Sequence, residues 1–252
     1  MEFDVDGVIF DLGSTLLEYE NIPWATLNID CLKEGYAYLE REGYDLPSVE
    51  EFLKGYIEVR EKFRLQAEKT LKEWVVTDAF AELLDRFGLN TRENLARDVF
   101  HAYYQPVKAQ LSVYADSAFV LESIKKSGRT IGLVSNTIFP EAYHRSELEK
   151  YGLLKYLDFA VFSSSFGYRK PHRTIYERAV VLAEIPPPRL LFVGDRYLED
   201  CRGPRENGLN AVLKYWAGRD YPDPMPGDVH VVKSLTEILP LIMDEFDGSG
   251  NS

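Results

Sequence analysis

VIFDLGSTL, residues 8–16, is the segment from which the predicted fold of this chain follows. Its apolar part, Val8 to Phe10, ends in the carboxylate of Asp11, and small residues follow at once. A short apolar run bounded by Gly and Ser is typical of a strand buried on both faces of a parallel sheet. Such a strand places Asp11 at its carboxyl end, where open α/β sheets bind their ligands. Taken alone, the segment also fits an aspartate that merely begins a turn.

The pattern of buried strands returns after Pro106. We expect strands at 130–134, 159–162, 190–193, 211–213 and 229–231, and helices at 117–126, 141–151 and from 167–171 to about 182. Regular alternation of strands and helices is typical of a parallel sheet covered by helices. The sequence therefore predicts an α/β fold with a Rossmann-like, doubly wound parallel sheet core.

The intervening residues, from about 18 to 110, follow a helical period. Apolar residues recur at helical spacing around Trp24–Leu32 and Phe52–Phe63. Shorter helices are expected at 77–87, with Thr77 or Asp78 as the N-cap, and at 91–104. We therefore expect a core domain at 1–17 and 110–245, a helical insertion at 18–109, and a Gly/Ser-rich disordered tail at 246–252.

The composition excludes several classes of partner. A net charge of −12 over 252 residues disfavours binding to nucleic acids or to anionic membranes. The sequence shows neither a transmembrane span nor a signal peptide. Two distant cysteines, Cys31 and Cys201, form no disulfide framework and suit a reducing compartment, so we expect a cytoplasmic protein. The four histidines lack the spacing of zinc ligands.

Polar residues end three of the predicted strands: Asp11, Ser135 and Asp195. Because the carboxyl ends of parallel strands share one edge of the sheet, these side chains are expected to converge, with Lys170 beside them. Asp11 and Asp195 offer the hard oxygen ligands that suit Mg²⁺. Ser135 and Lys170 are placed to hold a phosphoryl group, and Asp11 is a candidate nucleophile. The earlier Asp4-Val5-Asp6-Gly7 lacks a preceding strand and is not expected to contribute.

In these residues the chain resembles the haloacid dehalogenase-like (HAD) hydrolase superfamily, in the subfamily with a type 1 α-helical cap. Four motifs occur in order: Phe-Asp-Leu-x-x-Thr-Leu around Asp11, Val-Ser-Asn at 134–136, Arg-Lys-Pro at 169–171, and Gly194-Asp195 followed by Asp200. They cover the region from Val8 to about Gly208. The resemblance implies that the helical insertion at 18–109 is the cap domain.

The resemblance also implies an activity, the Mg²⁺-dependent hydrolysis of a small phosphorylated metabolite. Asp11 would form an aspartyl-phosphate, and Mg²⁺ would be bound by Asp11, Asp195 and the carbonyl of Gly13. Ser135, Asn136 and Lys170 would hold the phosphate. Asp200, which would orient a metal-bound water, and Thr15 would support the site. Glu199 and Arg196 are further candidates, each equally well explained as a surface residue.

Gly13 departs from the usual motif of family phosphatases, which have a second aspartate at this position as general acid and base. General acid–base catalysis contributes about 10²–10⁴-fold to a rate. Three explanations are open. The protein is a phosphatase that acts on good leaving groups or obtains its acid elsewhere; it cleaves carbon–halogen or carbon–phosphorus bonds; or it binds a metal or phosphorylated ligand without turning it over.

Overall fold

The computed structural model describes residues 2–89 and 92–243, so the tail predicted to be disordered, 246–252, lies outside the described residues. The chain forms two compact units. Within the described residues, the core unit contains 2–18, 113–136 and 141–243, and the helical unit contains 19–112 and 137–140. Residues 110–112 and 137–140, which the sequence had assigned to the core domain, thus belong to the helical unit.

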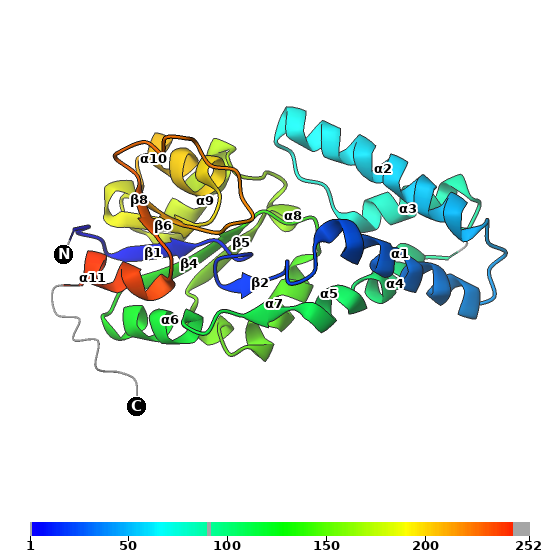
Figure 1. The fold of residues 1–252 in the computed structure, drawn as a ribbon, viewed down its shortest axis with the longest axis horizontal. Coiled ribbons are helices and arrows are strands. Elements are labelled where there is room, and N and C mark those ends of the chain that lie inside the picture. The colour runs from blue at the N-terminus through cyan, green and yellow to red at the C-terminus, as the bar shows by residue number, and fades with distance from the viewer. Residues whose placement is uncertain (1, 90–91, 244–252) are drawn as a thin grey trace. The chain divides into compact units, whose positions relative to one another are not determined.

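The core unit is built on a six-stranded sheet (Figure 1). In spatial order its strands are β5 (Phe159–Phe162), β4 (Thr130–Ser135), β1 (Gly7–Phe10), β6 (Leu190–Gly194), β7 (Asn210–Lys214) and β8 (His230–Val232). Every neighbouring pair is parallel. The predicted doubly wound α/β fold is confirmed, with β1 in the interior of the sheet.

Helices cover both faces of this sheet, with α9 and α10 on one face and α6 and α11 on the other (Figure 1). The helices of the core unit are α6 (Ser117–Lys126), α7 (Glu141–Lys150), α8 (Ser163–Phe166), α9 (Arg173–Ala183), α10 (Gly203–Glu206) and α11 (Leu239–Ile242). On one face, Ile175 and Tyr176 of α9 pack against Ile9 and Phe192 in a buried apolar cluster. This burial explains why the strands consist of continuous apolar runs.

In the described residues of the helical unit, five helices pack around an aromatic core. They are α1 (Trp24–Arg41), α2 (Val49–Thr70), α3 (Val76–Arg86), α4 (Leu95–Tyr103) and α5 (Gln105–Gln110). The ring centroids of Tyr56 and Phe80 lie 4.9 Å apart, and that of Phe139 lies 5.1 Å from Tyr104. Phe139 explains why 137–140 joins this unit. Among the described residues, no helix is both long enough and apolar enough to cross a membrane.

Several element boundaries differ from the expected ones. The helix predicted at 77–87 begins at Val76, and its N-cap is Val75, without a side-chain hydrogen bond, rather than Thr77 or Asp78. The helix predicted at 91–104 begins at Leu95, and Thr91 lies outside the described residues. Helix α5 was missed because Pro106 suggested a break, although proline is tolerated in the first turn of a helix. The two-residue strands β2 (Leu17–Glu18) and β3 (Ser112–Val113) were also missed.

Both cysteines are buried free thiols, and this generates a prediction about their reactivity. Burial raises the pKa of Cys31 to about 12 and also raises the pKa of Cys201. Because the thiolate is the reactive form, a disulfide reagent at pH 8 should modify the folded protein at least about a hundredfold more slowly than the urea-unfolded chain. A folded-state thiol that reacts at the unfolded rate would contradict this burial.

Candidate active site

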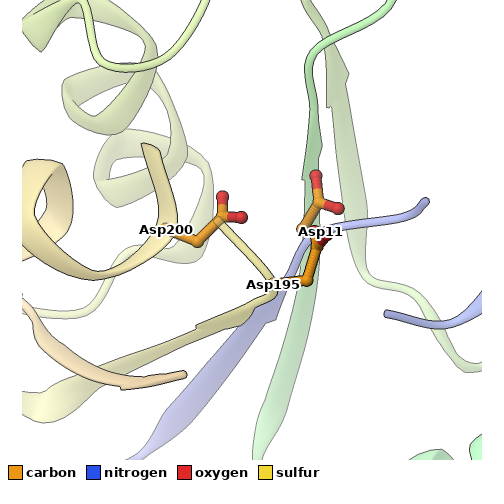
Figure 2. Close-up of side chains that lie close together, drawn as sticks. All are labelled: Asp11, Asp195 and Asp200. Atoms are coloured by element: carbon orange, nitrogen blue, oxygen red, sulfur yellow. The ribbon is translucent and has the colours of Figure 1, made fainter. Parts of the chain in front are cut away.

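Three carboxylates meet at the carboxyl edge of the sheet (Figure 2). Asp11 directly follows β1 and Asp195 directly follows β6, the strand paired with β1. Asp200 comes from a single π-helical turn, Tyr197–Arg202. One carboxylate oxygen from each residue lies within 4.8 Å of one from each of the others, and all three residues are buried. The fold therefore brings together the three acids that were expected from the sequence to lie at the site.

Lys170 lies between two of these acids. Its Nζ donates hydrogen bonds to Asp11 Oδ1 at 2.7 Å, to Asp200 Oδ1 at 2.6 Å and to the carbonyl oxygen of Val134 at 2.9 Å. All three donor positions of the ammonium group are thus used. The Lys170 side chain is only 1% exposed, so its charge acts in a region of low dielectric constant.

Asn136 fixes the backbone of Lys170. Its Nδ2 donates to the Lys170 carbonyl at 2.9 Å, and its Oδ1 accepts from the Lys170 N–H at 2.7 Å. Both ends of the Asn136 amide are thus engaged with this backbone, and its expected role in substrate binding stays a prediction. Asn136 therefore positions Lys170. Ser135, the last residue of β4, is buried beside it.

Burial shifts the acid–base equilibria of the cluster. Burial raises the pKa of Asp11, and the charge of Lys170 only partly opposes this effect. The pKa of Asp195 is raised to about 7 by burial and by the charges of Asp11 and Asp200. Burial alone would lower the pKa of Lys170, but the charges of Asp11 and Asp200 outweigh it and raise the pKa. The ammonium group is thus stably charged, whereas Asp11 and Asp195 need more positive charge nearby to stay ionised.

Asp195 shows where a cation fits. Its Oδ2 accepts a hydrogen bond from Nε of Arg219 at 2.6 Å, whereas its buried Oδ1 has no hydrogen-bond partner among the described residues. A buried carboxylate oxygen without a partner is costly. Carboxylate oxygens of Asp11 and Asp195 lie within 4.8 Å of each other, and hard oxygen ligands of this kind suit Mg²⁺. The residues present therefore fit a divalent cation.

The turn after Asp11 has an unusual backbone. Ser14 adopts a left-handed conformation with φ = 56°, which is uncommon for a residue with a side chain. Its N–H donates to the Leu17 carbonyl at 2.7 Å, and its own carbonyl accepts from Nζ of Lys214 at 2.7 Å. These bonds hold the strained turn, and with it the carbonyl group of Gly13. Thr15 is fully buried, and its Oγ1 has no partner within the described residues.

The π-helical turn fits closely against β6. A Cβ added to Gly194 would lie 2.4 Å from Cγ of Asp200, so only glycine leaves room for this carboxylate. Asp200 Oδ2 accepts from the Arg196 N–H at 2.9 Å, which fixes the second oxygen of the group. Pro204 cannot donate to Glu199, five residues before it, and the hydroxyl of Tyr176 donates to that carbonyl at 2.6 Å instead. π-helical turns are often found at functional sites.

A comparison with family models agrees with this geometry. The model for the haloacid dehalogenase-like hydrolases matches residues 5–208, which is most of the chain. The chain belongs to this family. The resemblance predicted from the four motifs is therefore confirmed, and the HAD match includes every residue of the carboxylate cluster.

Two curated HAD relatives show how far the sequence likeness extends. Haloacid dehalogenase-like hydrolase domain-containing protein 3 of Bos taurus is 29% identical over 159 residues, 62% of this chain and 60% of that protein. A glyceraldehyde 3-phosphate phosphatase of Methanothermobacter thermautotrophicus is 27% identical over 144 residues, 55% of this chain and 63% of that protein. The matched regions span less than two thirds of either relative.

Solved structures show the same HAD fold. A HAD phosphatase from Thermococcus onnurineus has a TM-score of 0.62 and 22% identity, covering 93% of this chain and 96% of that one. A 2-haloacid dehalogenase from Pseudomonas syringae pv. Tomato DC3000 has a TM-score of 0.68 and 20% identity, with the same coverages. Proteins named for different reactions share this fold, so the reaction has to be argued from the site.

Other charged residues of this HAD protein divide into those near the site and those away from it. Arg219 contacts Asp195 and Ser14, and Lys214 contacts Ser14. Neither could be found from the sequence, because neither belongs to a motif. Arg196 is exposed. Asp4 and Asp6 pair with Arg189 before β1 begins, away from the carboxyl edge, which agrees with their exclusion.

The contacts of Lys170 predict its contribution to stability. Lys170→Met leaves the carboxylates of Asp11 and Asp200 without their cation and should destabilise the metal-free protein by about 3 kcal/mol at pH 8, measured by urea unfolding. Because burial already raises the pKa of Asp11, protonation should make the loss smaller at pH 5.5. Lys126 is exposed and pairs with Glu122 in the same helix, so it gives a matched control. Lys126→Met should cause no measurable change in the free energy of unfolding. Equal losses of stability in the two variants would contradict the role of Lys170 as the cation that stabilises Asp11 and Asp200.

Proposed function

We propose that this protein is a Mg²⁺-dependent phosphatase that hydrolyses a small phosphorylated metabolite through a phosphoryl intermediate on Asp11. The observation that carries the proposal is the buried cluster of three carboxylates. Lys170 bonds two of them, and one oxygen of Asp195 has no hydrogen-bond partner in the part of the chain that the structure describes. A relative named as a glyceraldehyde 3-phosphate phosphatase supports a phosphorylated substrate. The free thiols of both cysteines are in keeping with the proposed cytoplasmic location.

The proposed ligands of Mg²⁺ are Asp11, Asp195 and the carbonyl group of Gly13. When bound, the cation would neutralise the negative charge of the phosphoryl group and so assist attack by an anion. Asp200 would remain outside this set, because its two oxygens are engaged with Lys170 and with the N–H of Arg196.

Asp11 is the proposed nucleophile. Lys170 bonds Oδ1 of Asp11 and so fixes the orientation of the carboxylate. The other oxygen attacks phosphorus, an O–P bond forms, and the bond from phosphorus to the leaving-group oxygen breaks with its electron pair on that oxygen. Water then hydrolyses the aspartyl-phosphate, which releases inorganic phosphate and restores Asp11. In this proposal Ser135 and Lys170 hold the phosphoryl oxygens, for which Lys170 exchanges one of its three present hydrogen bonds.

The first step leaves an anionic oxygen that needs a proton, and Gly13 cannot supply one. We therefore propose that the protein prefers substrates whose leaving groups are stable as anions. The alternative is a protein that binds a phosphorylated ligand without hydrolysing it, and Gly13 is the feature that favours this alternative. The role of the helical unit as a cap stays a prediction from the family resemblance.

The nucleophile assignment predicts the behaviour of an artificial substrate. The wild type should hydrolyse para-nitrophenyl phosphate only with Mg²⁺, and Asp11→Asn should lower kcat at least about a thousandfold, measured by release of nitrophenolate. Asp4→Asn is the matched control, since Asp4 is exposed and pairs with Arg189, and it should keep wild-type activity. Near-normal turnover by Asp11→Asn would refute the covalent mechanism.

The missing acid predicts how the rate depends on the leaving group. Wild-type kcat/KM should fall steeply from aryl to alkyl phosphates, and Gly13→Asp should raise the alkyl-to-aryl ratio at least about tenfold, because a carboxylic acid can protonate the alkoxide. Ser14, not Gly13, takes the left-handed backbone conformation, so aspartate meets no such strain at position 13. An unchanged alkyl-to-aryl ratio would show that the missing acid at position 13 does not limit the rate. Activity found only in Gly13→Asp would favour the alternative, a protein that binds its ligand without hydrolysing it.

A further inference from the structure

Arg219 connects two parts of the site that the sequence motifs treat as separate. It lies in the loop between β7 and β8. Its Nε donates to Asp195 Oδ2 at 2.6 Å, and its Nη2 donates to Ser14 Oγ at 3.2 Å. One guanidinium group therefore joins the end of β6 to the turn after β1. Its side chain is only 12% exposed, so this charge is poorly screened by solvent.

The same loop supports the guanidinium group of Arg219 with the ring of Trp216. The guanidinium carbon lies 4.4 Å from the ring centroid of Trp216, in the geometry of a cation–π contact. The Trp216 ring packs directly on Gly218, where an added Cβ would lie 1.4 Å from a ring carbon. Trp216 Nε1 donates to the carboxylate of Glu18 at 3.0 Å, which fixes the indole plane. Arg219 is thus held both by its contact with the Trp216 ring and by its hydrogen bonds to Asp195 and Ser14.

The same loop also fixes the backbone of Asp195. The hydroxyl of Tyr221 donates to the Asp195 carbonyl at 2.9 Å and accepts from the Trp216 N–H at 3.0 Å. Asp195 is therefore held at its main chain by Tyr221 and at Oδ2 by Arg219. Only Oδ1 is left without a partner within the described part of the chain.

We propose that Arg219 is a positioning residue for the divalent cation. It holds Asp195 in the orientation that reserves Oδ1 for the cation, and it ties that carboxylate to the turn that presents the Gly13 carbonyl. This inference rests on the metal site of the proposed function. Carboxylate ligands of metals are commonly oriented by such hydrogen bonds, and losing one typically costs about 10–100-fold in metal affinity.

A positioning role has a signature that separates it from simple charge repulsion. Mg²⁺ requires near-ideal octahedral geometry, whereas Ca²⁺ accepts variable numbers and angles of ligands. Loss of orientation should therefore weaken Mg²⁺ binding more than Ca²⁺ binding. Loss of a repelling positive charge would instead strengthen the binding of both ions. General loosening of the structure would weaken both ions equally.

The test is calorimetric titration of the metal-free protein with MgCl₂ and, separately, with CaCl₂. Arg219→Met should raise the Kd of Mg²⁺ at least about tenfold and that of Ca²⁺ less than about threefold. The matched control is Arg196→Met, which removes the same charge from an exposed residue next to Asp195 and should weaken neither ion. Arg219→Lys keeps the charge but cannot form the two-armed bridge, so it should also weaken Mg²⁺.

The outcomes are distinct. Unchanged or tighter Mg²⁺ binding by Arg219→Met, or equal losses for both ions, would overturn the positioning role while leaving the metal site intact. If circular dichroism shows that Arg219→Met is unfolded, Arg219→Lys decides, and Mg²⁺ affinity equal to that of the wild type would overturn the role. If the wild type binds neither ion, the proposed metal site and the role of Arg219 both fail. Metal binding without phosphatase activity would refute only the proposed reaction.

Discussion

The ion pairs of Lys170 are the interaction on which the site depends. A parallel sheet places the ends of its strands at one edge, and here two of these ends carry carboxylates that are almost entirely removed from water. Buried like charges repel strongly unless a cation lies between them. Lys170 provides that cation for Asp11 and Asp200, and the amide of Asn136 holds the lysine backbone in place. The fold can therefore bury Asp11 and Asp200 side by side, although burial still raises the pKa of Asp11.

Lys170 does not neutralise the site completely. Asp195 makes no bond to it and depends on Arg219, which reaches only one of its two oxygens. The strained backbone of Ser14 and the π-helical turn around Asp200 belong to the same small region. Local strain and unpaired polar atoms of this kind are tolerated where they serve function. Under the proposed function, a bound cation would relieve these features and stabilise the site.

The sequence was most informative where burial was complete. β1 and the strands paired with it were predicted because residues such as Ile9 and Phe192 lie inside the sheet, and apolar runs report this burial directly. Asp11, Asp195 and Lys170 could be found because each occurs in a recognisable motif. Arg219 could not be found, because its contact with Asp195 depends on the path of an irregular loop. The location of Phe139 in the helical unit likewise depends on tertiary packing.

The interior position of β1 also has a consequence for synthesis of the chain. Its partners, β4 and β6, follow roughly 120 and 180 residues later, as the pairing of Gly7 with Thr130 and with Leu190 shows. At ribosomal rates of about 5–20 residues per second, the first strand waits on the order of ten seconds for its second neighbour. Until β4 has been synthesised, the apolar segment 8–10 has no strand of the sheet to pair with, and its other edge stays open until β6 follows. Exposed apolar segments and unpaired strand edges favour aggregation, so the nascent chain is most prone to it before β6 has left the ribosome.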